Sequence, residues 1–499
     1  MTPIIPRIRA LAAAALLAAP LAAFPPVGNL APARGAATSS PALAARIDAI
    51  LARPALRQAR WGIVVQDAAS GRTLYARNGG RPFVPASNLK LVVAAAAAHH
   101  LPADFRWRTT VYATRPVCAG TLEGDLVLYG RGDPMISNRY FPTRETVWEA
   151  LADSLRARGV RRVAGAVVAD ASYWDADAVR PDWDVYDRLW WYGAPAGPLG
   201  FNDNSVDFRI EPGARRPTIT WEPRSSFVSL DNDATMGPAG TRSTFDLERA
   251  SRRHGVRAYG VLPAGAAAKT EHFAVADPAA YAGTTFREAL ERRGIEVVND
   301  EVRVVTDPAR SPARGATALA EHRSPPLPKA IGPILLNSQN WYAEQVVKTL
   351  GRERAGAGSW DAGLRVEREF LARVVGIDSS EFVLRDASGL SAGNRVTARG
   401  LVRLLDFIRR TPAQAMVRDA LPVSGGPGSL RARFPELPGR VRAKTGYIGG
   451  VDSLAGLVTR ADGSEVVFAI LANDTGQPSS VMKAGIDDVV RAIAADGGR

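Results

Sequence analysis

Residues 84–100, VPASNLKLVVAAAAAHH, carry a Pro-Ala-Ser lead and then an apolar, alanine-rich run that predicts a buried helix. A lysine, Lys90, interrupts the run three residues after Ser87. Residues three apart share one face of a helix, so the Lys90 amine can reach the Ser87 hydroxyl. A serine needs a base to take its proton, and a lysine can serve when burial keeps it partly neutral. The stretch therefore predicts a nucleophile beside its base.

Two further motifs decide what the first one means, because Ser-x-x-Lys alone is usually a capping serine followed by a surface lysine. Ser338-Gln339-Asn340 stands at the start of a helical segment, and Lys444-Thr445-Gly446 stands on a predicted strand. Lys444 and Thr445 offer a cation and a hydroxyl to a substrate carboxylate, and Gly446 allows close approach to the backbone. This ordered trio is the signature of penicillin-binding proteins and class A β-lactamases.

The distance between the motifs and the segments around them make the resemblance more specific. Lys90 and Ser338 are 338 − 90 = 248 residues apart, which is far too long for a compact β-lactamase. The chain resembles the class C low-molecular-mass penicillin-binding proteins, the serine D-alanyl-D-alanine carboxypeptidase/endopeptidase family. The segments that carry this resemblance, besides the trio, are GDLVLYGRGDP, LGFNDNSVDFRI, LRDASGLSAGNRVTARGLVRLL, LPVSGGPGSLRARF and KTGYIGGVDSLAGLV.

The resemblance implies a role for each residue of the trio. Ser87 is acylated, Lys90 acts as its base, and Ser338 relays a proton to the leaving D-alanine. Asn340 orients Lys90 and the acyl amide. The terminal carboxylate is held by Lys444 and Thr445, and the oxyanion hole is formed by the backbone N–H groups of Ser87 and Tyr447. No cofactor or metal is expected.

Two features bear on substrate preference. The family usually has a small Ser or Thr directly after Lys-Thr-Gly, where this chain has Tyr447, so the phenol is expected to reshape the carboxylate pocket. The family also recognises the diaminopimelate side chain through its insertion, which makes Asp170 and Trp174 candidates, together with Arg385. The alternative is that Trp174 packs and Asp170 caps a turn.

The fold class that follows is α/β (α+β): a transpeptidase/β-lactamase-like domain with an antiparallel sheet flanked by helices and a large β-rich insertion. The catalytic domain is predicted over residues 37–105 and 323–499. The insertion covers residues 106–322 and is mostly short strands and turns, with residues 201–277 as a possible inner subdomain. A hairpin is predicted from Arg60, a three-stranded meander after residue 440, and a final helix from about Ser480.

The N-terminus predicts export from the cytoplasm. Residues 1–36 resemble a signal peptide, with two arginines before an apolar run and small residues near its end. No transmembrane span is expected after cleavage, so the mature protein is predicted to be exported and periplasmic. The net charge of +13 comes from scattered arginines, which indicates a solvated surface and no nucleic-acid partner. The expected partners are peptidoglycan stem peptides and cross-links, with β-lactams as covalent inhibitors.

Several other hypotheses carry less weight. Gly389-Leu390-Ser391-Ala392-Gly393 fits the G-x-S-x-G elbow of α/β-hydrolases, but no histidine follows it. His99 and His100 are adjacent and point in different directions from a helix, which is unsuited to a metal site. An aromatic cluster near residues 183–192 either packs between subdomains or binds sugar. A β-lactamase or esterase with the same trio, and a non-catalytic wall-binding scaffold, stay open as alternatives.

Overall fold

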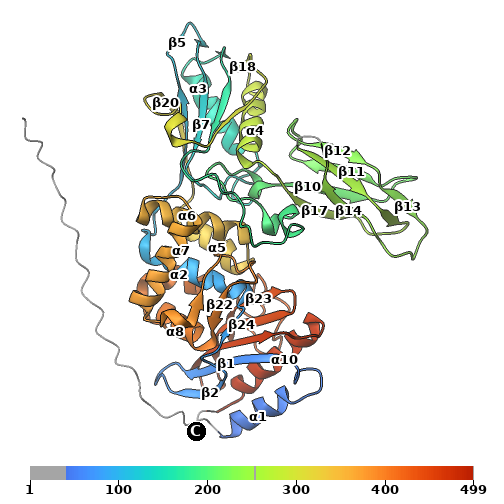
Figure 1. The fold of residues 1–499 in the computed structure, drawn as a ribbon, viewed down its shortest axis with the longest axis vertical. Helices are drawn as coiled ribbons and strands as arrows, with labels where there is room; N and C mark the ends of the chain where they lie inside the picture. Colours follow the sequence, from blue (N-terminus) through green and yellow to red (C-terminus); the bar gives the residue numbers. More distant parts are fainter. Residues whose placement is uncertain (1–40, 252–253, 498–499) are drawn as a thin grey trace, which may run out of the picture. The chain divides into compact units, whose positions relative to one another are not determined.

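The computed structural model describes residues 41–251 and 254–497, so the predicted signal peptide lies outside the described residues. Its central element is an antiparallel five-stranded sheet in the order β2-β1-β25-β24-β23 (Figure 1). The strands are β1 (Arg60–Asp67), β2 (Thr73–Arg77), β23 (Val441–Ile448), β24 (Val451–Thr459) and β25 (Glu465–Asn473). The predicted hairpin and meander are both confirmed, and the N-terminal strand β1 pairs with the last strand of the meander.

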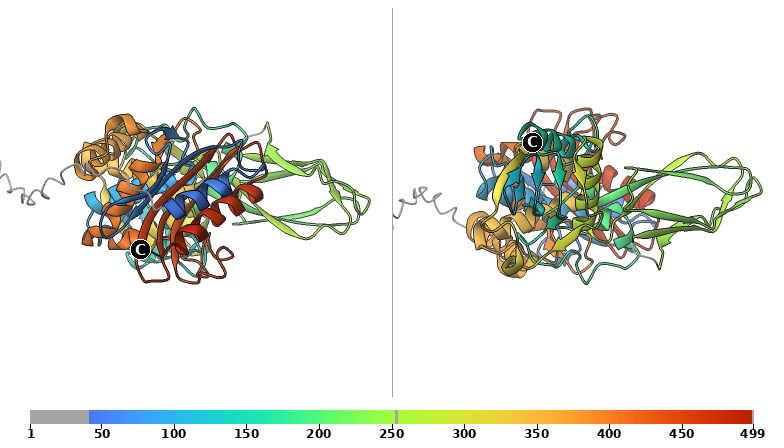
Figure 2. Two further views of the ribbon diagram at one scale, coloured as in Figure 1. Left: turned by 90° about the horizontal axis from the view of Figure 1, so that it is seen from below. Right: turned by 90° about the horizontal axis from the view of Figure 1, so that it is seen from above.

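Helices cover both faces of this sheet, as predicted. One face packs against α1 (Pro41–Leu51) and α10 (Ser479–Ala494), which cross it in the left view of Figure 2. Residues Val466, Phe468 and Ile470 of β25 point toward this layer, and Val467 and Ala469 point toward the other. Both faces are buried, so β25 is an almost continuous apolar run.

The second layer contains the helices that carry the catalytic motifs. They are α2 (Lys90–His100), α5 (Pro328–Leu336), α6 (Asn340–Ala355), α7 (Trp360–Glu369), α8 (Ala398–Arg410) and α9 (Ala415–Asp419). In α2, every residue from Lys90 to Ala98 is buried, because the helix packs against α5, α6, α7 and α8. Thr397 caps α8 by accepting a hydrogen bond from the Gly400 N–H. A small three-stranded sheet is formed by β3 (Pro82–Phe83), β22 (Arg395–Thr397) and β21 (Phe382–Val383).

The region between α2 and α5 has its own core and two groups of strands. The outer group is β4 (Arg108–Ala113), β5 (Val117–Cys118), β6 (Thr121–Leu122), β7 (Leu126–Gly130), β8 (Arg162–Val163), β9 (Val167–Asp170), β18 (Glu296–Val297), β19 (Arg303–Val305) and β20 (Thr317–Arg323). The first and last of these, β4 and β20, pair antiparallel, so the chain enters and leaves side by side.

The inner group has strands that form ladders only with one another: β10 (Ser205–Glu211), β11 (Thr218–Glu222), β12 (Ser229–Asn232), β13 (Thr235–Gly237), β14 (Asp246–Arg249), β15 (Gly255–Tyr259), β16 (Val261–Pro263) and β17 (Lys269–Ala274). The outer group also packs against two helices that a mostly β prediction did not describe, α3 (Thr146–Ala157) and α4 (Pro278–Arg292). Asp277 caps α4 and Pro278 opens it, a start signal that was present in the sequence.

Candidate active site

Ser87 lies in a 3₁₀ turn, Ala86–Leu89, that leads directly into α2. The Lys90 amine donates a 2.9 Å hydrogen bond to the Ser87 hydroxyl. The turn is held against β24, because Asn88 donates to the Ser453 hydroxyl and that hydroxyl donates to the Pro85 carbonyl, each over 2.8 Å. Ala86 has a φ of 47°, a strained value for a residue other than glycine and one that recurs at functional sites.

Lys90 is completely buried and has three hydrogen-bond acceptors. Besides Ser87, its amine donates to the Asn340 side-chain oxygen over 2.6 Å and to the Ser388 carbonyl over 2.7 Å. Burial lowers the pKa of Lys90 from 10.5 to about 7, although the carboxylates of Asp386 and Glu344 partly oppose this shift. Near neutral pH a large fraction of the amine is therefore unprotonated and able to accept a proton from Ser87.

The second amine reaches the site from the sheet. Lys444, also fully buried, donates to the Ser338 hydroxyl over 2.8 Å and to the Thr445 carbonyl over 2.7 Å. Burial, followed by the nearby charge of Lys90, lowers the pKa of Lys444 well below its usual value. Ser338 lies between α5 and α6 with a φ of 60°. Through the bonds of Lys90 and Lys444, the structure brings residues of all three motifs together beside the Ser87 hydroxyl.

Gly446 is where the edge strand β23 comes closest to the nucleophile. A Cβ at this position would lie 2.3 Å from the Ser453 Oγ, 2.8 Å from the Pro85 carbonyl oxygen and 3.1 Å from the Ser87 nitrogen. The next residue, Tyr447, is 59% exposed, so its phenol lies at the rim and does not fill the site. The backbone N–H groups of Ser87 and Tyr447 remain the predicted oxyanion donors.

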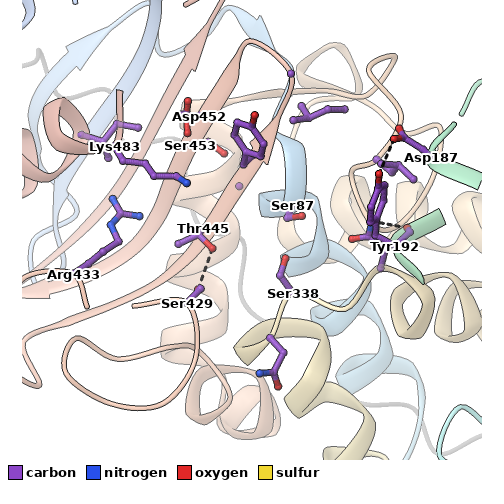
Figure 3. Close-up of a pocket in the computed structure, with 18 of the residues that line it drawn as sticks. Ser87, Asp187, Tyr192, Ser338, Ser429, Arg433, Thr445, Asp452, Ser453 and Lys483 are labelled. Carbon is purple, nitrogen blue, oxygen red and sulfur yellow. Dashed lines mark hydrogen bonds between the residues drawn. The ribbon is translucent and has the colours of Figure 1, made fainter. Parts of the chain in front are cut away.

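A cavity of about 770 Å³ is lined by Ser87, Ser338 and Thr445 among others, and Figure 3 shows how its walls are built. Trp191 and Tyr192 of the insertion line one wall, and the Tyr192 carbonyl accepts a 2.8 Å hydrogen bond from Asn340. The Tyr192 phenol donates to Asp187, whose pKa is raised by burial. The lining residues are Ser87, Asp187, Trp191, Tyr192, Asn337, Ser338, Asn340, Leu390, Ser429, Arg433, Thr445, Gly446, Tyr447, Ile448, Gly449, Asp452, Ser453, Lys483 and Ile486.

Several lining residues were not identified from the sequence. The Ser429 hydroxyl accepts a 3.0 Å hydrogen bond from the Thr445 hydroxyl, and Ser429 lies within LPVSGGPGSLRARF, which was noted only as a family segment. Trp191 and Tyr192 were noted as part of the aromatic cluster, without a place in the site. Arg433 lies in the same family segment as Ser429 but was not singled out. Asp187 and Lys483 carried no signal, because isolated charges on loops and helices are usually solvated.

Two buried carboxylates, those of Glu344 and Asp386, lie next to the site. Glu344 lies one helical turn after Asn340, accepts from the Ser388 N–H over 2.8 Å and from the Trp360 indole over 2.7 Å. This contact anchors Ser388, the residue whose carbonyl accepts from Lys90. Burial, then the charge of Asp386, raises the pKa of Glu344 to about 7. Asp386 accepts from the Trp183 indole over 2.9 Å, so one member of the aromatic cluster has a packing role.

Three candidates for substrate recognition lie outside the cavity. Asp170 is fully buried at the end of β9, where it accepts from the Ser172 N–H and the Ser311 hydroxyl. Trp174 is 2% exposed and lines a different cavity. Arg385 has an exposed side chain, and its backbone N–H donates to Asn394. The acidic residue that the insertion contributes to the cavity with Ser87 is Asp187.

The glycine-rich segment after Asp386 forms a turn beneath the nucleophile. Gly389 has a φ of 85°, and a Cβ there would lie 2.0 Å from the Ala86 carbonyl oxygen. Ser391 is buried and bonded to Asp182, so its hydroxyl is not presented as a nucleophile. In the described part of the chain, no cluster of three or more His, Cys, Asp or Glu could hold a metal ion.

Comparisons with known proteins match nearly the whole chain. The model of the D-Ala-D-Ala carboxypeptidase 3 (S13) family matches residues 43–495. A D-alanyl-D-alanine carboxypeptidase from Actinomadura sp. (strain R39) is 37% identical over 486 residues, covering 94% of this chain and 88% of the relative. Carboxypeptidase DacB from Mycolicibacterium smegmatis is 30% identical over 456 residues, covering 87% and 80%.

A solved structure confirms the predicted fold class. The crystal structure of penicillin binding protein 4 (dacB) from Haemophilus influenzae matches with a TM-score of 0.80 at 20% identity, covering 90% of this chain and 99% of that one. The same protein complexed with a β-lactam matches with a TM-score of 0.73.

Proposed function

Because the chain belongs to the D-Ala-D-Ala carboxypeptidase 3 (S13) family of serine peptidases, we propose that it hydrolyses D-Ala-D-Ala ends and cross-links of peptidoglycan through an acyl-enzyme on Ser87. The observation that carries this proposal is the bond between the Ser87 hydroxyl and an amine whose pKa burial lowers to about 7. Such an amine is a competent base at neutral pH.

The reaction follows from the contacts. Neutral Lys90 takes the proton of Ser87 as its Oγ attacks the carbonyl carbon, and the N–H groups of Ser87 and Tyr447 stabilise the oxyanion. Ser338, bonded to Lys444, passes a proton to the departing amine as the peptide bond breaks. Water then attacks the ester, and Ser87 regains its proton. A β-lactam reacts by the same first step, its ring amide opening on Ser87.

The substrate is a peptidoglycan stem peptide, and the two ends of the cavity fit its two parts. Lys444 and Thr445 hold the carboxylate of the leaving residue. Asp187 lies on the other side of Ser87 in Figure 3, where it offers a carboxylate to a cationic group of the acyl side chain.

Such a substrate also implies export. None of the described helices is long and apolar enough to cross a bilayer. The arginines that precede the first apolar run support a periplasmic enzyme whose signal peptide is cleaved.

Labelled penicillin with peptide mapping tests the assignment. The wild type should carry label on the Ser87 peptide, Ser87→Ala should carry none, and Ser391→Ala should keep it as a matched serine control. Covalent label on Ser87→Ala refutes the proposal. The β-lactamase alternative predicts rapid loss of label, and the scaffold alternative predicts binding to sacculi with no release of D-alanine or cross-linked fragments.

A further inference from the structure

The cavity extends past Thr445, on the side away from Ser87, into a space lined by two cations. Arg433 and Lys483 reach into this space from opposite directions, and Figure 3 shows both beyond Thr445. Lys483 belongs to α10, and Ile486 of the same helix also lines the cavity. We call it the basic bay, defined by Arg433, Lys483, Tyr447 and Asp452.

The cations of the basic bay are only partly neutralised. Arg433 is bound through Nε and Nη2 to the buried Asp487, and in the described part of the chain its Nη1 has no hydrogen-bond acceptor. Lys483 is exposed, and none of the described carboxylates lies within ion-pair distance of its amine. Asp452 is 2% exposed and accepts from the Ser479 hydroxyl over 2.5 Å. Burial raises the pKa of Asp452, although the Ser479 hydroxyl and the charges of Lys483 and Arg433 oppose this shift, so Asp452 faces both cations. Because Arg433 is paired with Asp487, Lys483 is the exposed cation of the bay.

The Tyr447 ring contacts one of the two cations of the basic bay. The Lys483 amine lies 5.2 Å from the centroid of its ring, a distance suited to a cation–π contact. The small residue usual at this position in the family has no ring for this contact. The tyrosine thus restrains a lysine at the mouth of the bay, beside the residue that holds the leaving-group carboxylate.

We infer that the basic bay is a subsite for a second carboxylate on the leaving group, so that the site suits anionic, cross-linked leaving peptides as well as free D-alanine. This inference rests on the proposed function. D-Alanine carries one carboxylate, which Lys444 and Thr445 already hold. A crossing peptide strand carries further carboxylates at a distance from the scissile amine, and Lys483 and Arg433 lie where those groups pass.

Matched substrates test the subsite. One acyl-D-alanyl donor is joined to D-glutamate, to D-2-aminoadipate, or to the neutral side-chain amide of each, so that each pair differs by one charge. For wild type, kcat/KM should be up to about fivefold higher for the diacid than for its amide, the effect of one partly exposed ion pair. The ratio should fall toward one in Lys483→Met, persist in Lys483→Arg and in the distant control Lys269→Met, and shrink in high salt.

Other outcomes separate the two proposals. If wild type hydrolyses the D-Ala-D-Ala substrate and takes penicillin label but shows no preference for the diacids, the subsite is refuted and the proposed function stands. A preference that survives in both Lys483→Met and Arg433→Gln refutes it as well. If no substrate is cleaved and Ser87 takes no label, the proposed function itself fails.

Discussion

Replacement of Gly446 by alanine probes the closest approach between the sheet and the nucleophile. The added methyl would meet the Ser453 hydroxyl at 2.3 Å and two backbone atoms, at 2.8 and 3.1 Å, that cannot swing away. The hydroxyl can rotate only by giving up its bonds to Asn88 and Pro85. Overpacking together with these bonds gives an expected loss of about 2–4 kcal/mol in unfolding free energy.

The effect on catalysis should be similar in size to the effect on folding when both are expressed as free energies. If the methyl pushes β23 away from Ser87, the oxyanion donors and the carboxylate site move relative to the hydroxyl, and a displacement near 1 Å lowers the rate about a hundredfold. The assay is stopped-flow acylation by labelled penicillin, with unfolding followed by circular dichroism. Gly449→Ala is the matched control in the same hairpin, because a Cβ there meets nothing within 4 Å. Acylation of Gly446→Ala within about threefold of wild type would refute the close-approach argument.

Three further predictions follow from the site. The rate of acylation should rise with pH through about 7 as Lys90 loses its proton. At pH 5 this rate should be about 50–100-fold below its plateau. A flat pH–rate profile for labelled penicillin contradicts Lys90 as the base. Ser338→Ala should slow D-alanine release by about 10²–10⁴-fold in a product assay with an unchanged circular dichroism spectrum, and normal turnover would remove Ser338 from the proton path. Asp170→Ala should lower the free energy of unfolding in denaturant by about 1–3 kcal/mol, because it leaves the Ser311 hydroxyl unpaired. A rise in KM without this loss of stability would instead support a role for Asp170 in substrate binding.

The parts of this structure that could be predicted from the sequence are those marked by a local pattern or by the order of motifs along the chain. Ser87 and Lys90 are three residues apart, so their contact follows from helical geometry. The approach of Ser338 and Lys444 came from the order of the motifs, and the meander came from alternating apolar runs and turns. No local pattern states that such distant segments meet; the family resemblance supplied that step.

The rest of the site depends on tertiary packing that no local pattern contains. Glu344 in isolation is an ordinary helix charge, and only the fold sets it against the Ser388 N–H beneath Lys90. The insertion has many carboxylates, and periodicity cannot tell that Asp187 lines the cavity while Asp170 is buried at a strand end. Lys483 likewise becomes informative only once α10 is known to lie beside Tyr447.

The pairing of the earliest and latest strands has a consequence for when the enzyme becomes active. The turn that holds the nucleophile is clamped by a bond between Asn88 and Ser453, 365 residues later in the chain. Contacts of such long sequence separation form late, because their loop-closure entropy must first be overcome. A nascent chain therefore cannot complete its acylating centre until β23 and β24, which carry Lys444 and Ser453, have been synthesised and paired.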